Sequence, residues 1–85
     1  MSSEQDIRDA LRDWIASESG KVSFEELTDQ TAIFSSGILK SFHVTDLILL
    51  IEELGERSIS IEDIRPGVFH DIDTIYANFF SVAKA

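Results

Sequence analysis

Residues 34–47 read Phe34-Ser35-Ser36-Gly37-Ile38-Leu39-Lys40-Ser41-Phe42-His43-Val44-Thr45-Asp46-Leu47. Small and polar residues are frequent in the first half, and the second half begins a run of apolar residues at helical spacing. The pattern predicts a long loop that delivers one serine, Ser41, to the start of an apolar helix. Such a serine is a favoured helix N-cap, because its hydroxyl can accept a hydrogen bond from an unpaired backbone N–H. The same position suits a phosphate-bearing group, since free amides and the helix dipole favour negative charge there.

The helix that follows is predicted to run from Ser41 or Phe42 to Glu53 or Leu54. Its apolar face is broad and contains Val44, Leu47, Ile48, Leu50, Ile51 and Leu54. Leu49 lies outside the narrowest apolar stripe, which indicates either contact with a third helix or an exposed residue available to a partner. Gly55 is expected to end this helix or to loosen its last turn.

An amphipathic helix is predicted upstream, over residues 4–19, with Ser3 as its N-cap and Gly20 just past its end. Its apolar face contains Ile7, Ala10, Leu11, Trp14 and Ile15. Residues 21–40, which join the two helices, follow no single period, although Ser23 with Glu26 predicts one capped helical turn. A structureless connection of this length is uncommon in a compact domain, so we expect an ordered and functional loop.

The remaining residues predict a short helical turn and a last long helix. Residues 60–63 resemble a capped start for one turn that must stop before Pro66. Asp71 can cap the last helix, whose apolar face contains Ile72, Ile75, Tyr76, Phe79, Phe80 and Ala83. The expected fold is therefore all-α, with three long helices plus one short helix in a small four-helix bundle and a long ordered first loop. Residues 1–85 would form a single domain.

Composition narrows the possible partners and compartments. The chain has 85 residues, with 7 basic and 16 acidic side chains and a net charge of −9, which disfavours binding to nucleic acid or anionic lipid. No apolar stretch reaches the roughly 20 residues of a membrane span, and the first residues lack the features of a signal peptide. The absence of cysteine excludes a disulfide scaffold and fits a reducing compartment. We expect a cytoplasmic monomer that binds other proteins, without membrane insertion.

The residues that usually carry catalysis or bind metals do not form a recognisable set. The two histidines, His43 and His70, have no second metal-binding side chain at ligand spacing, and a surface position is expected for both. The acidic residues do not follow the EF-hand pattern, and no phosphate-cradling glycine series or nucleophile elbow is present. We therefore expect no metal site, no catalytic residues and no enzymatic activity.

Taken together, these residues resemble the acyl carrier protein family, which includes the aminoacyl and peptidyl carrier proteins. The resemblance covers most of the chain. The matching segments are, in order, Phe34, Ser36-Gly37-Ile38-Leu39, Ser41-Phe42, Asp46-Leu47, Ile51-Glu52-Glu53, Ile59-Ser60-Ile61 and Phe69-His70-Asp71-Ile72-Asp73-Thr74-Ile75. The resemblance implies a bundle of this family's type with a 4′-phosphopantetheine arm, donated by coenzyme A, on Ser41. The arm's thiol would hold an acyl or aminoacyl group as a thioester and carry it between enzymes.

The same resemblance implies the partners and the surface that they contact. The partners are a phosphopantetheinyl transferase, a loading enzyme and a downstream acceptor enzyme of fatty acid, polyketide or nonribosomal peptide biosynthesis. The expected contact residues are Lys40, Phe42, Val44, Thr45, Asp46, Ile48, Leu49, Glu52 and Glu53. Two residues depart from the family pattern, because Lys40 stands where aspartate is usual and Phe42 where leucine or methionine is usual. Lys40 implies a divergent carrier with a dedicated transferase.

Two alternatives remain open. A carrier-like adaptor would keep the bundle but never be modified, and the unusual Lys40 favours this possibility. An unrelated helical interaction domain would use Ser41 only as a helix cap and bury Ile48 and Leu49 in a homodimer. The cargo also remains open, as does its place within the bundle or on the surface.

Overall fold

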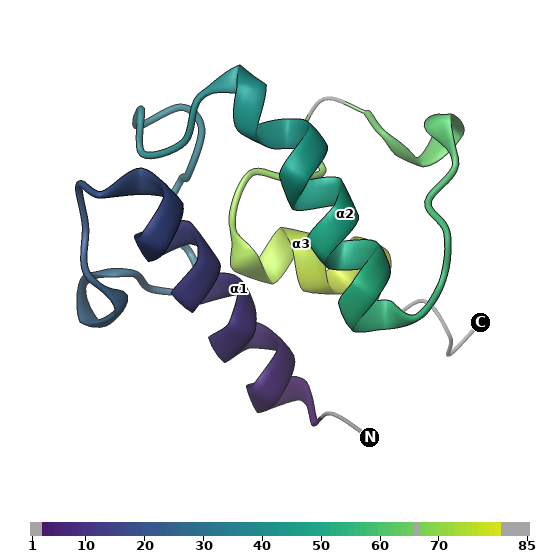
Figure 1. Ribbon diagram of the computed structural model, residues 1–85, viewed down its shortest axis with the longest axis horizontal. Helices are drawn as coiled ribbons and strands as arrows, with labels where there is room; N and C mark the ends of the chain where they lie inside the picture. The colour runs from purple at the N-terminus through teal and green to yellow at the C-terminus, as the bar shows by residue number, and fades with distance from the viewer. Residues whose placement is uncertain (1–2, 66, 81–85) are drawn as a thin grey trace.

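The computed structural model describes residues 3–65 and 67–80, and within these ranges every regular element is helical. The α-helices are α1 (Glu4–Ser19), α2 (Val44–Gly55) and α3 (Ile72–Phe79). Single 3₁₀ turns are η1 (Phe24–Glu26), η2 (Ser41–His43) and η3 (Ile61–Asp63). Figure 1 shows α1 and α2 running in opposite directions, with α3 crossing the space between them. The prediction of an all-α fold is confirmed.

The first helix has the predicted bounds because both of its ends are capped. The Ser3 hydroxyl accepts a hydrogen bond from the Asp6 N–H at 3.1 Å, and the Asp6 carboxylate accepts one from the Ser3 N–H at 3.4 Å. This reciprocal pair satisfies two backbone donors at the start of the helix. At the other end, Gly20 adopts the left-handed conformation, with φ of 68°, that terminates many helices.

The long connection between α1 and α2 is ordered, as predicted. Ser23 and Glu26 cap η1 reciprocally, and further along Ile33 and Leu39 are buried to 0% and 1% exposure. The Ile33 N–H donates to the His70 carbonyl at 3.0 Å, and the Leu39 N–H donates to the Ile33 carbonyl at 2.8 Å. Buried side chains and paired backbone groups therefore fix the loop on the core before it reaches Ser41.

Two details of the second helix differ from the prediction. The α-helix begins at Val44 rather than at Ser41 or Phe42, because the turn η2 precedes it, and it extends to Gly55. The left-handed residue at its end is Glu56, with φ of 54°, rather than Gly55. Gly55 itself has no left-handed conformation, and a Cβ there would lie 3.4 Å from the Phe80 ring, an ordinary contact distance.

The last part of the chain follows the predicted order with shorter elements. The predicted short helix is the single turn η3. In α3 the Asp71 carboxylate accepts a hydrogen bond from the Thr74 N–H at 2.7 Å, which confirms Asp71 as the N-cap. The helix is described to Phe79, and the predicted face position Ala83 lies outside the described residues.

The core is formed by all three helices together with the connecting segments. Its most deeply buried apolar side chains are Leu11, Ile15, Ile33, Leu39, Leu47, Ile51, Ile72 and Ile75. None of the helices that the structure describes is both long enough and apolar enough to cross a membrane. Packing of the loop residues beside the helix residues explains why a chain of this size has a continuous core.

Candidate functional site

Ser41 lies where the ordered connection enters the helical segment η2–α2. The prediction that Ser41 is the N-cap is wrong, because Lys40 occupies that position in an extended conformation with φ of −105° and ψ of 166°. Ser41 is instead the first residue of η2, and its side chain is exposed. Its hydroxyl makes no hydrogen bond to any residue that the structure describes. The site therefore presents an exposed hydroxyl to solvent at the start of a helical segment.

His43 supplies the capping interaction that Ser41 does not. The Lys40 N–H donates to the ring Nδ1 of His43 at 2.9 Å, and the His43 N–H donates to the Lys40 carbonyl at 2.9 Å. The ring lies edge-on to Trp14, with centroids 6.4 Å apart, and 4.4 Å from the Phe42 centroid. The expected surface position is therefore wrong for His43, which is buried, and is confirmed for His70.

The predicted contact residues divide into an exposed set and a half-buried set. The exposed members are Lys40, Phe42, Thr45, Asp46, Leu49 and Glu53, and the half-buried members are Val44, Ile48 and Glu52. Phe42 is 74% exposed and Leu49 is 57% exposed. These two residues are about two helical turns apart, so they lie on the same side of the segment. Phe42, Leu49, Asp46 and Glu53 thus combine apolar and acidic side chains on the segment that follows Ser41.

Glu52 and Glu53, adjacent in sequence, have different surroundings. The Glu52 carboxylate accepts a hydrogen bond from the Ile59 N–H at 2.7 Å and so holds the segment that follows α2. Glu53 is exposed, and no described residue pairs with its carboxylate. Glu53 is therefore available to a partner, whereas Glu52 stabilises the fold.

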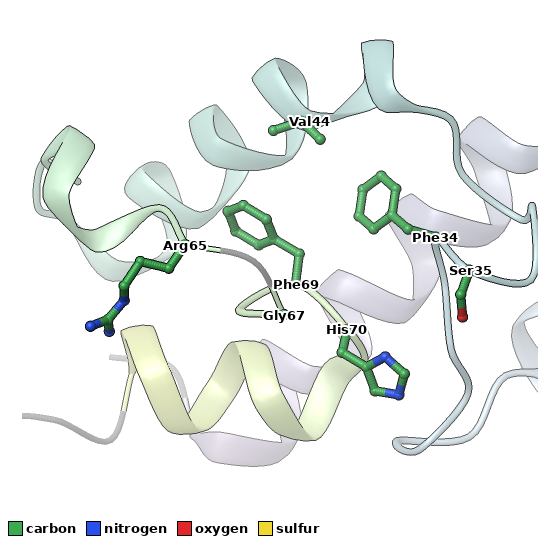
Figure 2. Close-up of a pocket in the computed structure, with 7 residues that line it drawn as sticks. All are labelled: Phe34, Ser35, Val44, Arg65, Gly67, Phe69 and His70. Atoms are coloured by element: carbon green, nitrogen blue, oxygen red, sulfur yellow. The ribbon is translucent and has the colours of Figure 1, made fainter.

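A cavity of about 300 Å³ lies beside the start of α2. Its lining residues are Phe34, Ser35, Val44, Arg65, Gly67, Phe69 and His70. Figure 2 shows the rings of Phe34 and Phe69 facing the space below Val44, with the guanidinium of Arg65 directed away from them. The cavity has no local signature in the sequence, because it forms between segments far apart in the chain. The only signal was the presence of aromatic residues in two predicted loops.

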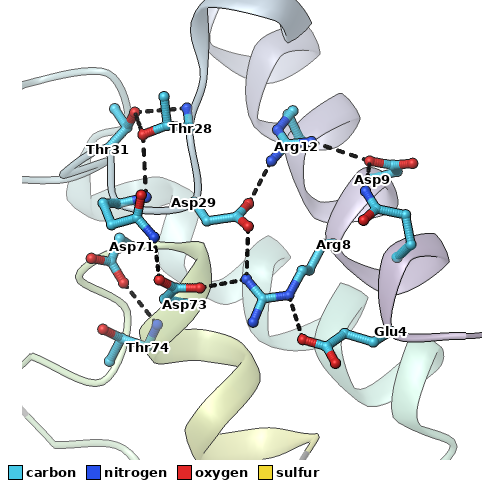
Figure 3. Close-up of polar contacts among 12 residues, drawn as sticks. Glu4, Arg8, Asp9, Arg12, Thr28, Asp29, Thr31, Asp71, Asp73 and Thr74 are labelled. Carbon is cyan, nitrogen blue, oxygen red and sulfur yellow. Dashed lines mark hydrogen bonds and ion pairs between the residues drawn. The ribbon is translucent and has the colours of Figure 1, made fainter.

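A cluster of charged residues on the other side of the connection fixes the loop to α1 and α3. Arg8 pairs with Asp29 at 2.9 Å and with Asp73 at 2.5 Å, and Arg12 pairs with Asp29 at 2.5 Å (Figure 3). Arg8 also pairs with Glu4 at 2.8 Å. The cluster was not predicted from the sequence, because it joins three segments that are distant along the chain.

The charges in this cluster shift the pKa values of two members. The hydrogen bond from Arg8, and then that from Gln30, lowers the pKa of Asp73 below its usual value. Burial lowers the pKa of Arg8, but its hydrogen bonds to Asp73 and Glu4 outweigh that effect and raise it. Within the described ranges no group of three or more histidine, aspartate or glutamate side chains is arranged to hold a metal ion. The cluster is thus an ion-pair network whose arginines are largely buried and whose outer carboxylates reach solvent.

Comparison of the chain with protein-family models, with curated proteins and with solved structures finds no match.

Proposed function

We propose that this protein is a carrier of the acyl carrier protein type, with a four-helix bundle in which η3 takes the place of the short helix. Ser41 would carry 4′-phosphopantetheine, and the protein would shuttle an acyl or aminoacyl group between enzymes. The observation that carries the proposal is the exposed, unpaired Ser41 hydroxyl at the start of a helical segment. An ordered loop delivers it there, so a modifying enzyme would meet a fixed backbone and a free nucleophilic oxygen.

The residues around Ser41 fit the arm. Its phosphate would be an ester of the Ser41 oxygen, formed as the pyrophosphate bond of coenzyme A breaks and as adenosine 3′,5′-bisphosphate and the hydroxyl proton leave. The start of the helix favours the negative charge of that phosphate. Lys40, one residue earlier, adds a positive side chain beside the phosphate. When bound, the arm supplies the thiol that this cysteine-free chain lacks and that a thioester requires. The chain itself contributes attachment and presentation rather than bond chemistry.

The surface beside Ser41 supports transient docking to enzymes. Phe42 and Leu49 expose apolar area, and Asp46 and Glu53 place negative charge next to it. A net charge of −9 favours encounter with basic surfaces. We infer that the transferase, the loading enzyme and the acceptor enzyme each present an apolar contact flanked by lysine or arginine. We further propose that the protein acts as a monomer in the cytoplasm.

The cavity beside Val44 could hold part of a small acyl group carried by the arm. Small-molecule pockets begin at about 300 Å³, so the cavity is at the lower end of their range. Val44, which lines the cavity, is three positions after Ser41, so the cavity lies about one helical turn along the chain from the proposed attachment point. The aromatic walls favour an apolar acyl group over a charged amino acid.

Intact-mass analysis after incubation with coenzyme A, Mg²⁺ and a broad-specificity phosphopantetheinyl transferase tests the proposal. We expect the mass of one phosphopantetheine to be added to the protein and not to a Ser41→Ala variant. If the wild-type chain gains nothing, the Lys40→Asp variant is tested with the same enzyme. Modification of that variant would show that Lys40 selects a dedicated transferase, whereas failure of both would contradict the carrier function.

Lys40 favours one alternative, an unmodified adaptor with the same fold. The adaptor would use the exposed face of Phe42 and Leu49 to bind a protein without any arm. A stable homodimer through the same face would argue against a shuttle, because a shuttle must expose that face. Sedimentation velocity tests the other alternative, an unrelated helical domain that forms a homodimer, since a dimer that dissociates on Leu49→Asp substitution would place this face in a permanent interface.

A further inference from the structure

We propose that His43 is a positioning residue, in which the neutral imidazole holds the backbone that presents Ser41 and a protonated imidazole releases it. This interaction between Lys40 and His43 is called the imidazole latch below. The latch itself follows from the contacts of His43. Its consequence for modification of Ser41 rests on the proposed carrier function, and the experiments below separate the two.

Two hydrogen bonds join Lys40 to His43 and so fix the backbone turn that contains Ser41 and Phe42. The Lys40 N–H donates to the His43 Nδ1, and the His43 N–H donates to the Lys40 carbonyl, each at 2.9 Å. An Nδ1 that accepts a hydrogen bond carries no proton, so the ring is neutral with its proton on Nε2. A second proton would occupy Nδ1 and turn the acceptor into a donor that faces another donor. The latched arrangement is therefore specific for the neutral ring.

The surroundings of the ring also oppose a positive charge. His43 is 9% exposed and contacts Trp14 on α1 and Phe42 on η2, neither of which can neutralise a cation as a carboxylate would. Among the residues that the structure describes, no carboxylate lies within ion-pair distance of His43. The nearest charged groups along the chain are Lys40, which is also positive, and Asp46, one helical turn later. Protonation would thus bury an unpaired charge unless the ring moved outward.

The residues on both sides of the latch confine such a movement to the Ser41 turn. Leu39, before it, is buried and donates its N–H to the Ile33 carbonyl at 2.8 Å. Leu47, after it, is fully buried in the core. Opening of the latch would therefore free residues 40–43 and leave the loop and α2 in place. A proton taken up at Nδ1 would therefore loosen the backbone of Ser41.

Amide hydrogen exchange of Lys40, measured by NMR and expressed as a protection factor at each pH, tests the latch directly. We expect the protection factor of the wild-type chain to fall about two- to tenfold between pH 8 and pH 5, the size of one lost hydrogen bond. Trp14 is the only tryptophan, and its fluorescence should change over the same range because a protonated imidazole beside it quenches emission. Constant protection of Lys40 across this range would overturn the proposal.

Three variants make the test specific. His43→Asn keeps an acceptor oxygen at the position of Nδ1 but cannot be protonated here, so Lys40 should stay protected at every pH. His43→Phe keeps the aromatic volume without an acceptor, so Lys40 should be unprotected at pH 8 as well. His70→Asn removes the other, exposed histidine and should retain the wild-type transition. A transition that persists in His43→Asn, or disappears in His70→Asn, would overturn the proposal.

The rate of phosphopantetheine attachment provides the functional readout. For each pH, the rate of the wild-type chain is divided by that of His43→Asn, which cancels the pH dependence of the transferase. We expect this ratio to fall about two- to tenfold towards pH 5, in parallel with the protection of Lys40. A constant ratio alongside an intact exchange transition would overturn the positioning role. If no variant is ever modified while the exchange transition remains, the carrier function fails and the latch stands.

Discussion

Arg8 on α1 donates a hydrogen bond of 2.5 Å to Asp73 on α3, although the two residues are 65 positions apart in the chain. The same guanidinium pairs with Asp29 in the connection and lies over the Tyr76 ring, 4.9 Å from its centroid. One side chain thus joins the first helix, the long loop and the last helix. The loop that presents Ser41 is therefore held on one side by the core and on the other by ion pairs.

This network should make the fold sensitive to acid through Asp73. Arg8, and then Gln30, lowers the pKa of Asp73 in the folded protein, whereas the unfolded chain has the ordinary value of about 4. The stabilisation is therefore fully present above pH 4 and is lost as the pH falls through the lowered pKa. We expect the urea midpoint to fall as the pH drops from about 4 to about 2, and to fall less in Asp73→Asn. Asp13→Asn, an exposed position on α1, is the control and should follow the wild-type curve.

The connection should contribute to global stability through Ile33. This side chain is fully buried although it belongs to a loop, so Ile33→Ala should cost about 2–5 kcal/mol and Ile33→Val about 0.5–1.5 kcal/mol. Ser35→Ala, at an exposed position of the same loop, should change stability by less than about 0.5 kcal/mol. Urea unfolding followed by circular dichroism measures all three. A cost for Ile33→Ala no larger than that for Ile33→Val would show that the loop is not part of the cooperative core.

Local patterns in the sequence predicted the features that depend on neighbouring residues. Helical spacing and capping signals located α1 with its caps Ser3 and Gly20, the turn η1, and the N-cap Asp71. Each of these depends on hydrogen bonds or conformations within a few residues, so a short window of sequence contains the cause. The exposed Phe42 and Leu49 were also foreseen as a partner surface, and their binding role stays a prediction.

The features that were missed depend on contacts between distant segments. His43 was expected at the surface because histidine is polar, and its burial requires Trp14 from another helix to cover it. The pairing of Arg8 with Asp73 has no local signature, and the same is true of the cavity between Phe34 and Phe69. Gly55 carried an ordinary helix-end signal, but the left-handed residue that ends α2 is Glu56. Knowledge of the helix arrangement is needed before any of these can be predicted.

The left-handed conformation of Glu56 should be a source of strain that glycine relieves. A residue other than glycine at φ of 54° costs the folded state about 1–2 kcal/mol. Glycine removes this cost, but it also makes the unfolded chain more flexible, which offsets part of the gain. Glu56→Gly should therefore raise the free energy of unfolding by about 0.5–1 kcal/mol. Gly20→Ala, at φ of 68°, should have the opposite effect of about 1 kcal/mol, since open space surrounds that site and only conformation is tested. Thermal and urea unfolding measure both. Glu56→Gln controls for the lost charge near the helix end, and a gain as large as that of glycine would refute the strain argument.

Substitutions at Glu52 and Glu53 should affect different properties, stability for Glu52 and partner binding for Glu53. Glu52→Ala removes the acceptor of the Ile59 N–H and should cost about 1–2 kcal/mol, whereas Glu53→Ala should change stability by less than about 0.5 kcal/mol. Glu52→Gln keeps an acceptor oxygen and should recover most of the loss. In the transferase assay at low salt, Glu53→Ala should raise KM, because an exposed charge steers a basic partner, and added salt should remove the difference. Glu52→Gln could instead raise KM as much as Glu53→Ala while both variants remain folded. In that case the partner binds both carboxylates, and Glu52 belongs to the docking surface in spite of its hydrogen bond to Ile59.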